Sequence, residues 1–246
     1  MFNALESHGI SSLYTPGVWR KPHAGVLFSP HGESMSGRAI VFIDGNNWYH
    51  SVRGLGLTDL GRLDYGKVSR KLVGPARDWV GTRYYVGQVN QAEAPDQYAN
   101  QRRFLSTLSA TDSRITHHLG RLETRLVEND AAAELLRMLN SLPTRIDIRV
   151  YKDLVALAQR HHRVAVKVEK AVDVMVAVDM VSMALRGEYE SAYVLSADGD
   201  LTPAVEEVRR MGKSVYIASP NRGAQLAAAA NAFIRVDAAW FGECWP

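Results

Sequence analysis

Cysteine is nearly absent from this sequence of 246 residues, because Cys244 is the only one. A disulfide framework within the chain is therefore excluded, and such cysteine usage is typical of the reducing cytoplasm. The eight histidines have no cysteine partners at zinc spacing, so a structural zinc site is not expected. No run of about 18 apolar residues occurs, and we expect no membrane span. The sequence predicts a cytoplasmic protein.

An excess of charge of one sign is also nearly absent, with 29 lysines and arginines against 26 aspartates and glutamates. The formal net charge is +3 and the isoelectric point is near 9.0. This mild basicity does not by itself indicate nucleic-acid binding, so the placement of the charges matters more than their sum.

The composition changes near residue 38. Residues 1–37 are rich in Ser, Gly, His and Pro and show no sustained hydrophobic period. This composition predicts an N-terminal segment that is weakly ordered or docked on the domain surface. Residues 38–237 read as one domain. The apolar tail of residues 238–246 is expected to pack on that domain or on a second subunit, so a homodimer remains open.

Strand signals alternate with helix-length segments from residue 38 onward. This alternation predicts an α/β domain with a mainly parallel sheet covered on both faces. The expected strands are 39–44, 82–89, 146–151, 191–196, 213–218 and 232–237.

The clearest helix signal covers residues 171–187. It is apolar nearly all round, which predicts a buried helix, and it ends at Gly187. Asp173 and Asp179 interrupt this apolar surface. They lie roughly 120° apart around a helix axis, so they need not serve one site.

Aspartates follow two of the expected strands. Asp44 ends the first strand, and Asp198 and Asp200 follow the strand 191–196. Ligands of open α/β sheets bind beyond the carboxyl ends of the strands, so Asp44, Asp198 and Asp200 would converge there if the two strands are neighbours. Asp173, at the start of a helix, could be the fourth member. Such a cluster of hard oxygen ligands suits Mg²⁺ or Mn²⁺ and phosphate chemistry. Taken singly, an aspartate after a strand is usually part of a turn or a helix cap, and the conjunction of several aspartates is what favours a site.

Three motifs in order resemble those of the NYN domain, in the LabA-like branch of the PIN-like nucleases. The first is FIDGNNWYH at residues 42–50, and the second is KAVDVMVAVDMVSMA at residues 170–184. The third is VLSADGDLTPAVEEVRRMGKSVYI at residues 194–217. Ala171 and Ala197 depart from the family pattern, since glycine is common at both positions.

The resemblance implies a three-layer α/β/α PIN-like domain with a parallel sheet in the order 3-2-1-4-5. It implies a metal-dependent nuclease, expected here to be an endoribonuclease using Mg²⁺ or Mn²⁺. Carried over by position, the acidic metal set is Asp44, Asp173, Asp198 and Asp200. Asn47 would be a polar active-site residue, and Asp179 an additional acid of less defined role.

Two basic clusters, at residues 114–125 and 159–170, are candidates for holding RNA. Such runs are usually solvated surface, but the second immediately precedes Asp173. Cations beside a metal centre would bind the phosphate backbone. The predicted nucleic-acid contacts are Arg121, Arg160, Arg163, Lys167 and Lys170. Trp48 and Tyr49 could stack on a base or pack in the core.

Two other functions compete with RNA cleavage. The first is a non-cleaving RNA-binding or regulatory module with the same fold. The second is a phosphatase of the haloacid dehalogenase type, which needs an aspartate acid/base two residues after its nucleophile. Asn46 stands at that position and cannot transfer the proton in the same way, so the phosphatase ranks last.

Overall fold

The computed structural model describes residues 37–57, 59–141, 147–221 and 223–245. The weakly ordered N-terminal segment predicted for residues 1–37 lies outside this part of the chain, apart from Gly37. Within the described ranges, no helix combines the length and apolarity needed to cross a membrane.

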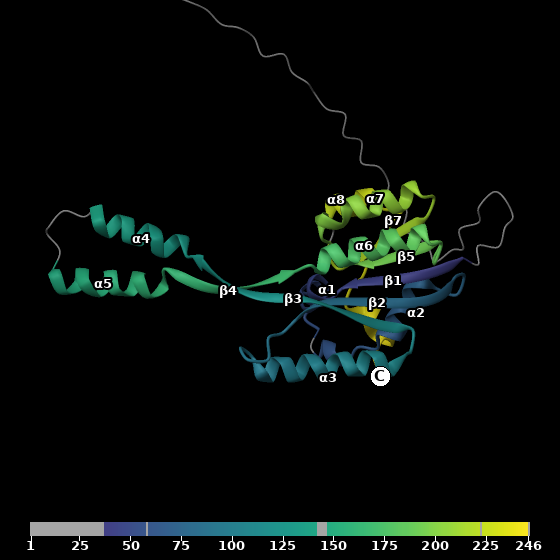
Figure 1. Ribbon diagram of the computed structural model, residues 1–246, viewed down its shortest axis with the longest axis horizontal. Helices are drawn as coiled ribbons and strands as arrows, with labels where there is room; N and C mark the ends of the chain where they lie inside the picture. Colours follow the sequence, from purple (N-terminus) through teal and green to yellow (C-terminus); the bar gives the residue numbers. More distant parts are fainter. Residues whose placement is uncertain (1–36, 58, 142–146, 222, 246) are drawn as a thin grey trace, which may run out of the picture. The chain divides into compact units, whose positions relative to one another are not determined.

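A seven-stranded sheet forms the centre of the fold, in the order β4-β3-β2-β1-β5-β6-β7 (Figure 1). Every neighbouring pair is parallel except β3 with β4. The strands are β1 (Arg38–Asp44), β2 (Asp78–Gln88), β3 (Ile115–Glu128), β4 (Arg163–Lys170), β5 (Ser191–Leu195), β6 (Ser214–Ser219) and β7 (Ala232–Arg235).

The prediction of an α/β fold with a mainly parallel sheet is confirmed. The expected order 3-2-1-4-5 corresponds to β3-β2-β1-β5-β6, and the observed sheet differs by one extra strand at each edge. The antiparallel strand β4 extends one edge and β7 extends the other.

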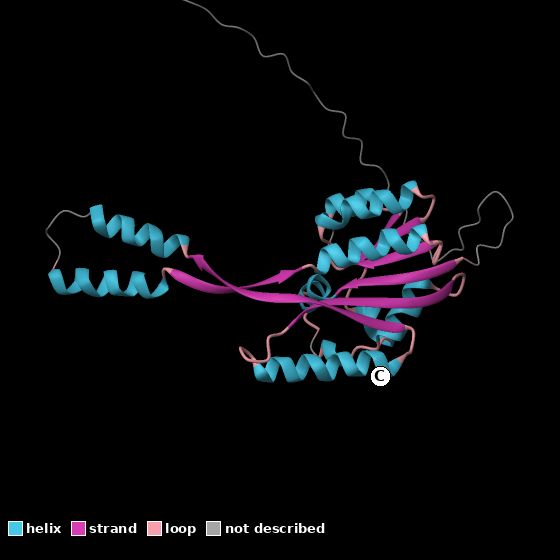
Figure 2. Cartoon of the chain, viewed as in Figure 1, coloured by secondary structure: helices cyan, strands magenta, loops and turns pink. Residues whose placement is uncertain are grey.

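Helices cover both faces of this sheet (Figure 2). One apolar core lies under α1, α2 and α3 and contains Trp48, Val68 and Leu105. The other lies under α6, α7 and α8 and contains Met180, Val205 and Leu226. The helices are α1 (Gly45–Arg53), α2 (Tyr65–Val73), α3 (Pro95–Thr111), α4 (Asp130–Ser141), α5 (Ile148–His161), α6 (Val172–Leu185), α7 (Thr202–Arg210) and α8 (Ala224–Ala229), with the short 3₁₀ helices η1 (Leu60–Arg62), η2 (Gly199–Leu201) and η3 (Ala239–Glu243).

The strand predicted at residues 146–151 is wrong. Residues from Ile148 onward form α5, and the Asp147 side chain caps it by accepting a hydrogen bond from the Arg149 N–H. The alternating apolar residues of IDIRVY fit a strand, but the apolar positions continue at helical spacing through Ala158, and this longer pattern prevails.

Strands β3 and β4 were not predicted as strands. Their sequences were interpreted as the two basic clusters, because charged side chains interrupt the apolar pattern. The two strands pair from Arg121 opposite Lys170 to Glu128 opposite Arg163. Much of this ribbon is exposed, so burial imposes little apolar character on it.

Helix α6 is less buried than its sequence predicts. Val176 and Met180 are fully buried, whereas Val174 is 65% and Val178 57% exposed. The expectation of burial all round was therefore wrong, since the helix packs on one face of the sheet and leaves its opposite side open. Gly187 follows the helix in the left-handed conformation (φ 66°), as a C-terminal glycine does.

The C-terminal residues lie against the core below α1 and α2. Phe241 in η3 is fully buried beside Trp48, with ring centroids 5.9 Å apart. The Lys67 ammonium donates to the Trp245 carbonyl at 2.6 Å. The tail thus contributes to the hydrophobic core of the same chain.

Candidate metal centre

The site begins where β1 and β5 end side by side. Ile43 is in register with Leu195, so Asp44 and Ser196 follow at the same edge of the sheet. The chain turns at Gly45 directly into α1, where a Cβ atom would lie 2.5 Å from the Tyr84 ring and 2.7 Å from the Tyr85 carbonyl oxygen. Glycine is therefore needed to bring Asp44 into this turn.

Asp44 is buried, with 3% of its surface exposed. Its carboxylate accepts hydrogen bonds from the Asn47 N–H at 3.2 Å and from the Ser196 hydroxyl at 3.1 Å. Burial nevertheless raises the pKa of Asp44 to about 6, and the nearby negative charge of Asp173 contributes. The folded chain therefore holds a carboxylate whose ionisation is costly.

Asp198 is held by the loop that follows β5. The Asp198 N–H donates to the Ser196 hydroxyl at 3.1 Å, and an Asp198 carboxylate oxygen accepts from the Asp200 N–H at 2.9 Å. Ser196 is fully buried and thereby links the two aspartates. Both carboxylates are fixed by groups of the fold itself, before any ligand is considered.

Asp173 enters the site from the first turn of α6. Its pKa is raised above the ordinary value, because the surroundings withdraw solvent and because Asp198 and Asp200 lie close. Ala171 precedes the helix with φ 70°, a left-handed conformation that costs an alanine about 1–2 kcal/mol. This strained residue sets the entry of the chain into α6.

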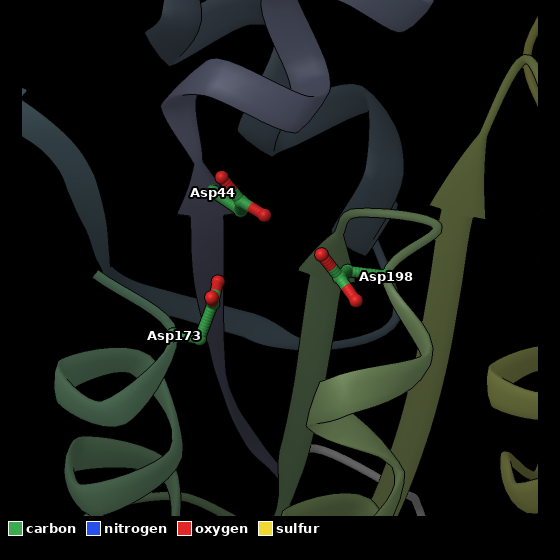
Figure 3. A group of neighbouring side chains, drawn as sticks. All are labelled: Asp44, Asp173 and Asp198. Atoms are coloured by element: carbon green, nitrogen blue, oxygen red, sulfur yellow. The ribbon is translucent and has the colours of Figure 1, made fainter. Parts of the chain in front are cut away.

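The three carboxylates converge from separate elements (Figure 3). One oxygen each from Asp44, Asp173 and Asp198 lies within 4.8 Å of the others. Three hard anionic oxygens at this spacing, without histidine or cysteine, fit Mg²⁺ or Mn²⁺ better than a soft metal. The raised pKa of Asp44 fits as well, because a divalent cation would stabilise a carboxylate whose ionisation is made costly by burial and by the charge of Asp173.

The other two predicted catalytic residues lie beside this cluster. Asp200 is exposed on η2 and falls outside the group of three, although its charge contributes to the raised pKa of Asp173. The Asn47 side-chain oxygen accepts from the Ala197 N–H at 3.0 Å. Asn47 therefore ties α1 to the loop that carries Asp198.

Asp179 occupies a separate position along α6. Its carboxylate accepts from the Arg83 guanidinium at 3.0 Å and from the Tyr85 hydroxyl at 2.7 Å. Both partners belong to β2, so the structure gives Asp179 a bond between helix and sheet.

Glu169 was missed in the sequence. It is the penultimate residue of β4, and its carboxylate accepts a hydrogen bond from the Gly87 N–H. Burial raises the pKa of Glu169, with a smaller contribution from Asp173. Its place near the end of β4 is the available signal, but the surrounding charges favour a basic cluster in the sequence.

The predicted RNA-contact residues divide between the two faces of the β3–β4 ribbon. Arg121 and Lys170 are register partners on one face, three residues before Asp173. Lys167 points to the opposite face, since successive residues of a strand alternate. Arg163 lies seven residues from Lys170, or roughly 23 Å along the strand, and Arg160 is on α5. Of these five residues, Lys170 is the one that directly precedes the turn into α6, which carries Asp173.

The two aromatic residues of the first motif also separate. Trp48 is buried in the core, 1% exposed. Tyr49 is 42% exposed on α1 and is the one available to stack on a ligand.

No curated protein matches the sequence. A protein of unknown function from Vibrio parahaemolyticus has a solved structure that aligns over 84% of this chain and 96% of its own, with 15% identity and a TM-score of 0.49. A family model described as the NYN domain matches residues 120–237, which contain Asp173, Asp198 and Asp200. Asp44 precedes the matched residues, and the fold brings it beside Asp173 and Asp198.

Proposed function

We propose that this chain is a divalent-metal-dependent ribonuclease that hydrolyses phosphodiester bonds in RNA. The observation that supports this most is the convergence of Asp44, Asp173 and Asp198 within 4.8 Å. The similarity of residues 120–237 to the NYN domain, a family of PIN-like nucleases, supports the proposal. The LabA-like motifs in the sequence point the same way.

The three aspartates would hold Mg²⁺ or Mn²⁺, which when bound polarises phosphoryl oxygens and activates water. Hydrogen bonds within the chain fix the orientation of two of these carboxylates. Ser196 and the Asn47 N–H orient the Asp44 carboxylate, and the Asp200 N–H orients that of Asp198. Below about pH 6 Asp44 carries a proton that a cation must displace, so metal affinity should fall as the pH decreases.

Arg121 and Lys170 are the residues that we propose to hold the RNA backbone. They share one face of the ribbon beside the entry to α6. Replacing both by alanine should weaken RNA binding and lower the slope of log affinity against log salt by about 2. Replacing the distant Arg160 and Arg163 instead is the matched control and should change both quantities less.

The decisive experiment is cleavage of labelled single-stranded RNA with Mg²⁺ or Mn²⁺. Asp44→Asn and Asp198→Asn should each lower the rate at least about a hundredfold. Asp153→Asn makes the same chemical change at an exposed position of α5 and should cut at the native rate. Unchanged cleavage in both site variants would exclude this site.

The choice of test substrate distinguishes endonucleolytic from exonucleolytic cleavage and RNA from DNA as the substrate. A circular RNA should be cut if cleavage is endonucleolytic, since it offers no end to an exonuclease. Cleavage of DNA but not RNA would contradict the proposed substrate. Binding of RNA without turnover, in either metal, would favour the non-cleaving module.

A further inference from the structure

Most of the exposed large apolar side chains in the described residues gather in one segment. We call residues 122–141 and 147–169 the arm, which consists of the outer β3–β4 ribbon with α4 and α5 between the two strands (Figure 1). Its exposed members, with exposures from 42% to 67%, are Leu126, Val127, Met138, Ile148, Val150, Leu157, Val164 and Val166. Isolated surface apolar residues are ordinary, but a concentration of this kind marks an interface.

The two helices of the arm cannot cover each other's apolar surface. Helix α4 buries only Ala132 and Leu139 among its described residues, and α5 buries only Ala158. Val150 and Leu157 are seven residues apart, so they lie on one side of α5, and both are exposed. Two packed helices bury only the strip along which they touch, whereas a four-helix bundle buries the inward side of every helix.

The charges of the arm indicate a second copy as the partner. Helix α4 carries two acids and one base, while α5 carries three lysines or arginines and one acid. A two-fold axis that sets α4 of one copy against α5 of the other would bring opposite charges together. An apolar surface with nearly balanced charge does not suit RNA, and an anionic membrane would require a strongly basic face.

We propose that the arm is a homodimerisation element, in which α4 and α5 of two copies form a four-helix bundle. The remaining apolar surface then lies inside the bundle, and the exposed ribbon valines extend the contact. Dimerisation through the arm is independent of the RNA chemistry at the carboxylate cluster.

One other surface competes as the dimer contact. An apolar groove of about 460 Å³ lies between α6 and α7, lined by Val178, Val181, Leu185 and Pro203. Val178 is 57% exposed, close to the 51% of Val150. A substitution at Val178 therefore matches one at Val150 in chemistry and exposure but lies outside the arm.

Light scattering of the full chain at tens of micromolar, coupled to gel filtration, tests the proposal. The native protein should show twice the 27.3 kDa chain mass. The double variant Val150→Glu, Leu157→Glu should raise the dissociation constant at least about a hundredfold and run as a monomer with native circular dichroism. Val178→Glu should remain a dimer. A native monomer, a dimeric arm variant or a monomeric Val178→Glu would each overturn the proposal.

Charge swapping tests the pairing of α4 with α5 directly. The variant Asp130→Lys, Glu134→Lys and the variant Arg149→Glu, Lys152→Glu should each dimerise more weakly alone. When mixed, they should form a heterodimer detectable by native mass spectrometry. Failure of the mixture to favour the heterodimer over either homodimer would refute the arrangement of α4 against α5.

Discussion

Replacing Asp44 by asparagine should stabilise the metal-free protein above pH 6. The Asp44 carboxyl is buried, and its pKa is about 6 instead of 3.8. The folded state therefore holds this proton more tightly than the unfolded chain does. The resulting stability is fully present below the unfolded pKa and is lost as the pH rises through 6. Asparagine carries no charge and avoids that loss.

The size of the effect follows from the pKa shift. A shift of roughly two pKa units corresponds to about 3 kcal/mol. Asparagine can still accept from the Asn47 N–H and caps a helix as well as aspartate does. Disturbing the bond to Ser196 offsets about 1 kcal/mol. The net gain of about 2 kcal/mol should raise Tm by roughly 4–8 °C.

Thermal unfolding followed by circular dichroism in EDTA measures this gain. The difference between native protein and Asp44→Asn should be complete at pH 8 and should vanish near pH 4. Added Mn²⁺ should raise the Tm of the native protein and leave the variant nearly unchanged. Asp153→Asn should match the native Tm under all these conditions. A lower Tm for Asp44→Asn at pH 8 in EDTA would refute the view that this carboxylate is strained by burial.

Three further predictions concern neighbouring residues. Ala171→Gly should raise the free energy of unfolding by about 0.5–1 kcal/mol in urea titrations, because glycine adopts φ 70° without strain; a loss of stability would contradict this. Ser196→Ala should destabilise the fold by about 1–3 kcal/mol and move the pH midpoint of RNA cleavage upward, since the Ser196 hydroxyl favours the ionised form of Asp44; an unchanged midpoint would count against that coupling. Arg114 and Arg70 lower the pKa of Asp112, so Asp112→Asn should reduce the free energy of unfolding by about 1 kcal/mol at pH 7. The difference from the native protein should narrow below about pH 4, and a difference independent of pH would show that the charge is not responsible.

Strand-end residues were the most predictable part of the molecule. Short apolar runs ending in Asp44 and before Asp198 indicated buried parallel strands, and parallel strands carry their ends to one edge. The order of the five inner strands came from the family resemblance, and the residues alone could not have given it. Asp173 was conspicuous because a carboxylate in an apolar helix needs a reason.

Residues that depend on unrecognised neighbours were not predictable. Glu169 lies near the cluster only because β4 pairs with β3. Val164, Val166 and Val168 alternate along β4, but the basic residues around them favour a charged surface cluster in the sequence. Residues 146–151 alternate over six positions, and this short pattern favours a strand although the longer helical pattern prevails. Asp179 joined the family motif in sequence, but its partners Arg83 and Tyr85 are visible only in the fold.

Anomalous scattering from a crystal soaked in Mn²⁺ tests the metal centre most directly. The expected result is a peak bound jointly by the carboxylates of Asp44, Asp173 and Asp198, and the loss of that peak in crystals of Asp198→Asn. A native crystal with millimolar Mn²⁺ and no peak among these three residues would contradict the proposed centre.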